Sequence, residues 1–89
     1  MIEAVAIITG ASKGIGRSIS LGLAKLNYKT LLFARNETEL IGLCDEIKVK
    51  YPNTPEPKYY VCDLLDSEKT SEILQSVIQE YSQIDILVN

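Results

Sequence analysis

The sequence predicts an α/β fold with a doubly wound parallel sheet, and three observations support this prediction. Short apolar runs of strand type alternate with longer segments of helical periodicity. The runs are continuously apolar, as expected for strands buried on both faces of a parallel sheet. A glycine-rich turn follows the first run and opens the first helical segment. With strands numbered along the chain and right-handed crossovers, we expect the partial sheet order 3-2-1-4.

The first predicted strand covers residues 5–9, and the glycines at positions 10, 14 and 16 form the turn after it. The helix that follows should end near Asn27, a residue that tolerates the left-handed conformation. One apolar stripe of this helix is expected to pack on the sheet: Ile15, Ile19, Leu23 and Leu26.

A second strand is predicted over residues 30–34, followed by a helix that ends near Tyr51 and Pro52. Asn36 is a suitable N-cap for this helix, with Glu39 as the partner in a capping box. Its expected buried face is Leu40, Leu43, Cys44 and Ile47.

The third and fourth strands are predicted over residues 58–62 and 85–89, after a proline-rich loop and a third helix respectively. Asp66 or Ser67 should cap this third helix. Its expected buried face is Ile73, Leu74, Val77, Ile78 and Tyr81.

Composition excludes several classes of function. A net charge of −3 does not suit a general nucleic-acid or anionic-membrane binder, and the absence of histidine removes the commonest zinc ligand and general base. We expect no metal site, and we interpret Cys44 and Cys62 as buried free thiols of a reducing compartment. No secretory signal or membrane-length apolar run is present, so we expect a cytoplasmic protein with no membrane partner.

The glycine-rich turn is the strongest functional signal in the chain. Its spacing, G-x-x-x-G-x-G, differs from the common G-x-G-x-x-G fingerprint and from a Walker A loop. A strand before it and a helix after it still predict a phosphate site, because free N–H groups and the positive end of the helix dipole face the turn. The alternative is a tight strand-to-helix turn that binds nothing.

Residues 9–16, Thr-Gly-Ala-Ser-Lys-Gly-Ile-Gly, resemble the T-G-x-x-x-G-x-G motif of the short-chain dehydrogenase/reductase family. Residues 34–36 (Ala-Arg-Asn), 62–64 (Cys-Asp-Leu) and 85–89 (Asp-Ile-Leu-Val-Asn) agree with it. The resemblance implies a Rossmann-type fold and an NADP(H)-dependent oxidoreductase. It also implies hydride transfer between nicotinamide and a small-molecule carbonyl or alcohol, in a homodimer or homotetramer. We expect residues 1–89 to be the N-terminal part of one dinucleotide-binding domain, a fragment of a longer chain.

The preference for NADP(H) over NAD(H) is inferred from the end of the second strand. An acid that would accept from a ribose 2′-hydroxyl is absent there, and Arg35 offers a fork of donors suited to a 2′-phosphate. Lys13 could reach the same phosphate. The alternative is that both are solvated surface charges.

The family resemblance assigns further cofactor contacts. It implies that Asp63 accepts from the adenine amino group, although a turn-forming role for this residue is the alternative. The resemblance places Leu64 beside the adenine ring and makes Asn89 the first residue of an N-N-A-G motif that lines the cleft. The complete expected cofactor-binding set is Gly10, Ser12, Lys13, Gly14, Ile15, Gly16, Arg35, Asn36, Asp63, Leu64 and Asn89. Of these, Ile15 is expected to donate its amide while its side chain packs below the turn.

The catalytic residues of the family are not present in the sequence. Family members use a tyrosine with a lysine four residues later, and none of the five tyrosines here has that partner. We therefore assign no catalytic residue and expect the 89-residue chain to be inactive alone. An alternative function is a non-catalytic NADP(H)-binding module that senses the nucleotide or assembles with a partner chain.

Overall fold

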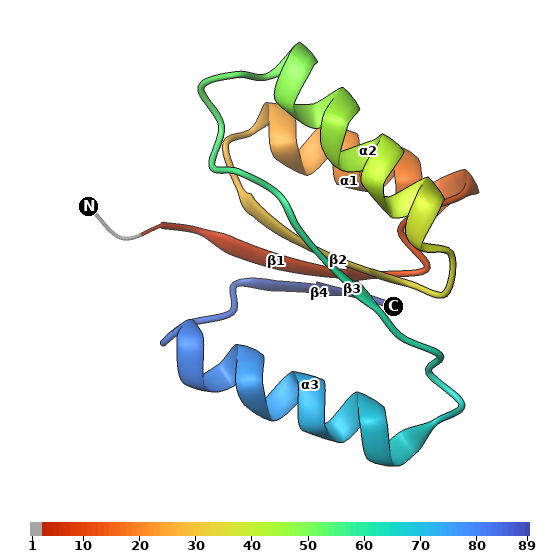
Figure 1. Ribbon diagram of the computed structural model, residues 1–89. Helices are drawn as coiled ribbons and strands as arrows, with labels where there is room; N and C mark the ends of the chain where they lie inside the picture. Colours follow the sequence, from red (N-terminus) through yellow and green to blue (C-terminus); the bar gives the residue numbers. More distant parts are fainter. Residues whose placement is uncertain (1–2) are drawn as a thin grey trace.

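The computed structural model describes residues 3–89 and has three layers (Figure 1). A four-stranded parallel sheet lies between α1 and α2 on one face and α3 on the other. The sheet order is β3-β2-β1-β4, which confirms the predicted fold class and strand order. The elements are β1 (Val5–Thr9), α1 (Gly14–Lys25), β2 (Lys29–Ala34), α2 (Glu37–Lys50), β3 (Lys58–Val61), α3 (Ser67–Glu80) and β4 (Ile86–Val88).

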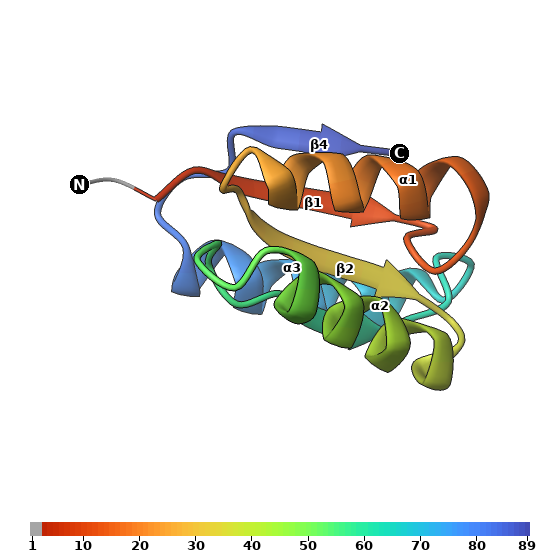
Figure 2. The same ribbon diagram turned by 90° about the horizontal axis from the view of Figure 1, so that it is seen from above.

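The register of the sheet brings the carboxyl ends of its strands to one edge. Ile8 pairs with Leu32 of β2 on one side and with Val88 of β4 on the other, and Leu32 pairs with Tyr59 of β3. The strand arrowheads and the turns into the three helices therefore lie at the same end of the molecule (Figure 2). In a parallel α/β sheet this is the end at which ligands bind.

Alternate residues of the central strands form two separate cores. Ala6, Ile8 and Leu32 face α1 and α2, whereas Ile7 and Phe33 face α3. Because helices lie on both faces of the sheet, the two central strands are apolar at most positions, as the sequence predicts.

The predicted buried face of α1 is only partly confirmed: Leu23 packs against the core, but the two ends of the predicted stripe do not. Ile15 and Leu26 are 80% and 68% exposed, and the fully buried residues of the helix are Ser20 and Ala24. Gly16, Ser20 and Ala24 follow one another at intervals of four, and the Ser20 hydroxyl donates to the Gly16 carbonyl at 2.7 Å. This row of small residues lets α1 lie close to the sheet. The expectation that Ile15 packs below the turn fails for the same reason.

The other two helices agree better with the sequence. All four predicted residues of α2 are buried, and the side chain of Asn36 caps its first turn. Asp66 caps α3, and Val77 is buried, but Ile78 is 63% exposed and lies outside the core. Asn27 has the expected left-handed backbone, with a φ of 70°.

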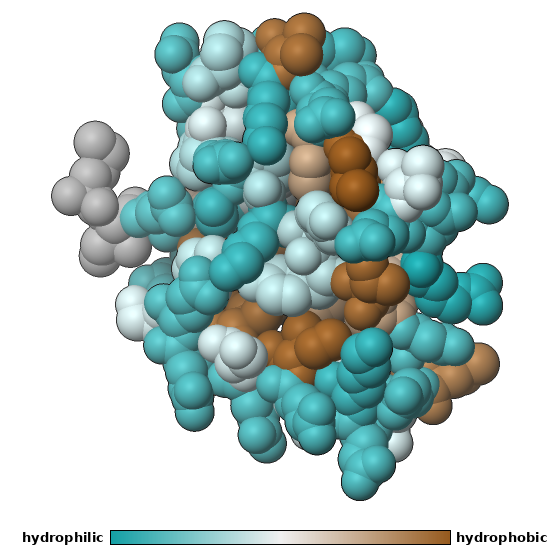
Figure 3. All heavy atoms as spheres, viewed as in Figure 1, coloured by the Kyte–Doolittle hydropathy of each residue, from teal (hydrophilic) through white to brown (hydrophobic). Residues whose placement is uncertain are grey.

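The face of the sheet under α3 is only partly covered. Figure 3 shows apolar atoms gathered between the sheet in the centre of the view and α3 below it. Leu87 of β4, which pairs with Ile7, is 66% exposed. Within residues 3–89, no helix combines the length and the apolar character that crossing a membrane requires.

Candidate functional site

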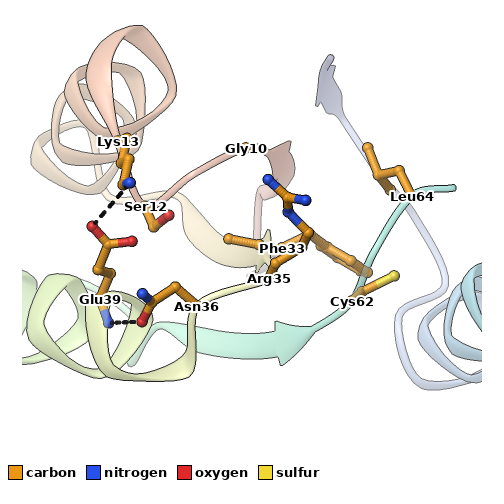
Figure 4. Close-up of a pocket in the computed structure, with 10 residues that line it drawn as sticks. Gly10, Ser12, Lys13, Phe33, Arg35, Asn36, Glu39, Cys62 and Leu64 are labelled. Atoms are coloured by element: carbon orange, nitrogen blue, oxygen red, sulfur yellow. Dashed lines mark hydrogen bonds and ion pairs between the residues drawn. The ribbon is translucent and has the colours of Figure 1, made fainter.

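A cavity of about 640 Å³ opens at the carboxyl ends of β1, β2 and β3 (Figure 4). It lies beside the turn into α1 and the first turn of α2. No residue of β4 lines it, and the lining residues come from the ends of β2 and β3 and from the turns beside them. The lining residues are Gly10, Ser12, Lys13, Phe33, Ala34, Arg35, Asn36, Glu39, Cys62 and Leu64.

The glycines of the turn are required either for a left-handed backbone or for close packing. Gly10 and Gly14 have φ angles of +61° and +54°, in the left-handed region, and a Cβ atom at either position would meet open space. Gly16 has ordinary helical geometry, but a Cβ atom there would lie 2.2 Å from the Gly10 carbonyl oxygen. The turn is therefore held closed by contact between the Gly10 backbone and the start of α1.

The N-terminus of α1 differs from those of the other helices. Its N-cap residue, Lys13, forms no side-chain capping hydrogen bond, and the first turn of α1 contains no acidic residue. By contrast, Asn36 and Asp66 accept from backbone N–H groups of α2 and α3, whose first turns do contain acidic residues. The first N–H groups of α1 are thus left without a side-chain acceptor, next to the cavity.

Lys13 and Glu39 face each other at one side of the cavity (Figure 4). The Lys13 Nζ atom is 3.9 Å from Glu39 Oε2, and Glu39 Oε1 is buried without a hydrogen-bond partner among the described residues. The sequence did not identify Glu39 as a site residue. Its only signal was the capping-box spacing from Asn36, and only half of that box forms. Asn36 Oδ1 accepts from the Glu39 N–H at 3.0 Å, while the Glu39 side chain turns to Lys13.

Arg35 follows β2 and lies between the two ends of the cavity in Figure 4. Its side chain is exposed and forms no ion pair with any residue in the range 3–89. The nearby carboxylate of Glu37 is engaged elsewhere: it accepts from the Tyr59 hydroxyl at 3.1 Å, and this hydrogen bond raises the pKa of Tyr59. Arg35 therefore keeps its donors available at the cavity.

Asp63 and Leu64 lie after β3 at the opposite side of the cavity from Lys13. Leu64 lines the main cavity, whereas Asp63 lines a smaller neighbouring pocket of about 270 Å³ together with Arg35. Asp63 Oδ1 accepts from the Leu65 N–H at 3.0 Å, so the turn-forming alternative describes part of its role. Its other carboxylate oxygen forms no hydrogen bond with the described part of the chain.

Asn89 and three residues of the glycine turn lie outside the main cavity. Asn89 Oδ1 accepts from the Thr9 hydroxyl at 3.2 Å, which joins the ends of β4 and β1. Of the expected cofactor-binding set, Gly14, Ile15, Gly16, Asp63 and Asn89 do not line the main cavity.

Besides Glu39, three residues that line the cavity are outside the expected cofactor-binding set: Phe33, Ala34 and Cys62. Phe33 closes its floor and stacks on Tyr60, with ring centroids 4.8 Å apart. Cys62 is buried beside it, and its Sγ lies 3.2 Å from the Thr70 hydroxyl oxygen. The sequence assigns none of them a cofactor contact, because an apolar run gives no signal for which of its residues lies at a cavity.

Residues 4–89 match the family model described as short chain dehydrogenase. The chain belongs to this family of oxidoreductases. The family resemblance stated from the sequence is therefore confirmed, and so is the Rossmann-type arrangement of this short chain dehydrogenase.

Two relatives of this short chain dehydrogenase are named as 3-oxoacyl reductases. Over 85 residues the chain is 41% identical to a very-long-chain 3-oxoacyl-CoA reductase of Ajellomyces capsulatus. The aligned stretch covers 94% of this chain and 24% of the relative. A 3-oxoacyl-[acyl-carrier-protein] reductase, FabG, of Staphylococcus epidermidis is 32% identical over 85 residues, or 94% of the chain and 34% of the relative.

Solved structures give the same result. A betaketoacyl-[ACP] reductase (FabG) from Bacteroides thetaiotaomicron superposes with a TM-score of 0.94 at 38% identity, over 100% of this chain and 38% of that one. A metagenomic short-chain oxidoreductase in complex with NADP superposes with a TM-score of 0.86 at 30% identity. The match covers 97% of this chain and 38% of that one. The short chain dehydrogenase sequence thus spans well under half of the proteins that it matches.

Proposed function

We propose that the chain forms the cofactor-binding part of an NADP(H)-dependent oxidoreductase that acts on a carbonyl or alcohol substrate. The observation that supports this most directly is the uncapped N-terminus of α1. Its N–H groups lack a side-chain acceptor, its first turn lacks acidic residues, and it opens beside a cavity at the carboxyl edge of the sheet. An anion is the natural acceptor for such groups.

The residues present fit a dinucleotide. The positive φ angles of Gly10 and Gly14 shape the turn, and the close approach of Gly16 leaves no side chain between the turn and α1. A diphosphate would be held by backbone N–H groups in this region. Asp63, whose second carboxylate oxygen is free, would accept from an adenine amino group, and Leu64 would contact the ring.

Two basic residues favour a 2′-phosphorylated ribose. Arg35 forms no ion pair within the described residues and is exposed at the cavity, and Lys13 faces the same space. The guanidinium of Arg35 suits bidentate recognition of a phosphate. The relative solved in complex with NADP supports the same cofactor for this chain.

The nicotinamide, when bound, supplies the chemistry, which is hydride transfer to or from a carbonyl or alcohol carbon. The part played by residues 1–89 is to bind and orient the cofactor. The relatives named as 3-oxoacyl reductases support a carbonyl compound as the substrate.

Titration of the 89-residue chain with NADPH and NADH, followed by nucleotide fluorescence, tests the proposal. NADPH should bind more tightly. Arg35→Asp should weaken NADPH binding by about 10- to 100-fold, the value of a hydrogen-bonded charged group, while NADH binding changes little. Lys25→Asp makes the same charge change at the far end of α1 and serves as the control. Tighter binding of NADH, or an equal loss for both nucleotides, would contradict the proposal.

A further inference from the structure

Glu39 places a negative charge inside the cavity that the proposed function assigns to an anionic ligand. It is the third residue of α2, and it lines the cavity with Lys13 and Arg35. One carboxylate oxygen, Oε2, lies 3.9 Å from Lys13 Nζ. The other, Oε1, is buried and has no hydrogen-bond partner among the described residues. A buried acceptor without a partner is unusual in a folded protein and requires an explanation.

The Glu39 carboxylate is favourable for one kind of ligand and unfavourable for another. A ribose 2′-hydroxyl is a donor, so it can donate to this carboxylate, and a turn of the side chain is needed to expose the buried Oε1 to it. A 2′-phosphate offers only acceptor oxygens and negative charge when ionised, so it is repelled by the carboxylate. The phosphate must also take Lys13 away from Glu39 before the lysine can bind it.

Resting on the proposed function, we propose that Glu39 is a specificity-determining residue that limits the preference for NADP(H) over NAD(H). It holds Lys13 when no phosphate is present, and its carboxylate, once the side chain turns into the cavity, accepts from the 2′-hydroxyl of NAD(H). Arg35, which forms no ion pair within the described residues, favours the phosphorylated cofactor. The selectivity of the cavity is the balance between these two residues.

Glu37 provides a matched control on the same helical turn. Its carboxylate accepts from the Tyr59 hydroxyl at 3.1 Å, and the residue does not line the cavity. Glu37→Gln and Glu39→Gln remove the same charge two residues apart and keep nearly the same side-chain volume. Only Glu39→Gln removes the carboxylate beside Lys13.

The test is titration of the 89-residue chain and both variants with NADPH and with NADH, in one low-salt buffer. In Glu39→Gln the ratio of the dissociation constants, NADH over NADPH, should rise about tenfold, as expected when one charge near a phosphate is removed. In Glu37→Gln the ratio should change by less than about twofold, because solvent screens the more distant charge. Far-UV circular dichroism of the variants confirms that each remains folded.

A double-mutant cycle with Lys13→Gln isolates the competition for the lysine. If Glu39 acts partly by holding Lys13, Glu39→Gln should improve NADPH binding less in the Lys13→Gln background than in the wild type. A purely structural role for Glu39 would change both nucleotides equally and show no coupling. Equal ratios in the two glutamate variants would overturn this inference and leave the proposed function intact. Failure of the wild-type chain to bind either nucleotide would overturn both.

Discussion

Replacing Gly16 with alanine should destabilise the protein, whereas the same replacement at Gly22 should stabilise it. Both glycines lie in α1, and neither has a positive φ angle. An added Cβ at Gly22 meets nothing within 4 Å, but at Gly16 it lies 2.2 Å from the carbonyl oxygen and 2.9 Å from the carbonyl carbon of Gly10. The two substitutions therefore share their intrinsic effect on the helix and differ in the clash.

The expected magnitudes follow from these distances. At Gly22 the gain is about 1 kcal/mol in the free energy of unfolding, the helix-propensity difference between glycine and alanine. At Gly16 the obstacle is backbone, so the turn or the helix must move, and overpacking of this kind costs roughly 1–3 kcal/mol. Because both variants gain the same helix propensity, they should differ by the overpacking cost alone, about 2 kcal/mol.

Urea denaturation followed by circular dichroism measures the difference. The Gly22→Ala variant should have a higher midpoint than the wild type and the Gly16→Ala variant a lower one, with unchanged slopes. A Gly16→Ala variant as stable as Gly22→Ala would show that the turn adapts without cost. That result would refute the argument that contact with the Gly10 carbonyl fixes the position of α1.

Two further predictions concern the strand ends and the alkaline limit of stability. Asp85 Oδ2 accepts from the buried Val5 N–H at 2.8 Å. Asp85→Ala should therefore cost about 1–3 kcal/mol of unfolding free energy, and Asp85→Asn, which keeps an acceptor, less. Burial and the Glu80 hydrogen bond raise the pKa of Tyr81 to about 12, above its value of about 10 in unfolded chains. The stabilisation of the folded state by protonated Tyr81 is complete below about pH 10 and is lost as the pH rises to about 12. The urea midpoint of Tyr81→Phe should therefore fall less steeply with pH in this range than the midpoint of the wild type.

The sheet and α2 could be predicted from the sequence because their signals are local. A continuous apolar run such as residues 30–34 is buried on both faces, and the spacing of Leu40, Leu43 and Ile47 selects one face of a helix. In α1 the same reasoning held for Leu23 but not for Ile15 and Leu26, which are exposed, and the fully buried residues of the helix are small. Close contact at Gly16 fixed the rotation of the helix instead, and small residues signal such contact only weakly.

The candidate site could also be predicted only where its signals are local. The glycine pattern located the turn, and the end of β2 located Arg35, because both follow from strand and helix boundaries. Glu39 was missed because its role depends on where its side chain turns. The capping-box rule would direct that side chain to the backbone of Asn36, but the Lys13 ammonium attracts it into the cavity instead. A pairing between the turn that precedes α1 and the first turn of α2 is not encoded in either segment alone.

The contact between Gly16 and the Gly10 carbonyl links the stability of the fold to the shape of the site. Because it sets the rotation of α1, it places Ser20 and Ala24 against the sheet, and it also determines where the uncapped N–H groups of the helix point. The left-handed backbone at Gly10 and Gly14 controls only the path of the turn. The glycines thus meet two separate requirements, close packing and unusual backbone geometry. Both must be met between the end of β1 and the first turn of α1, which explains why the pattern is confined to seven residues.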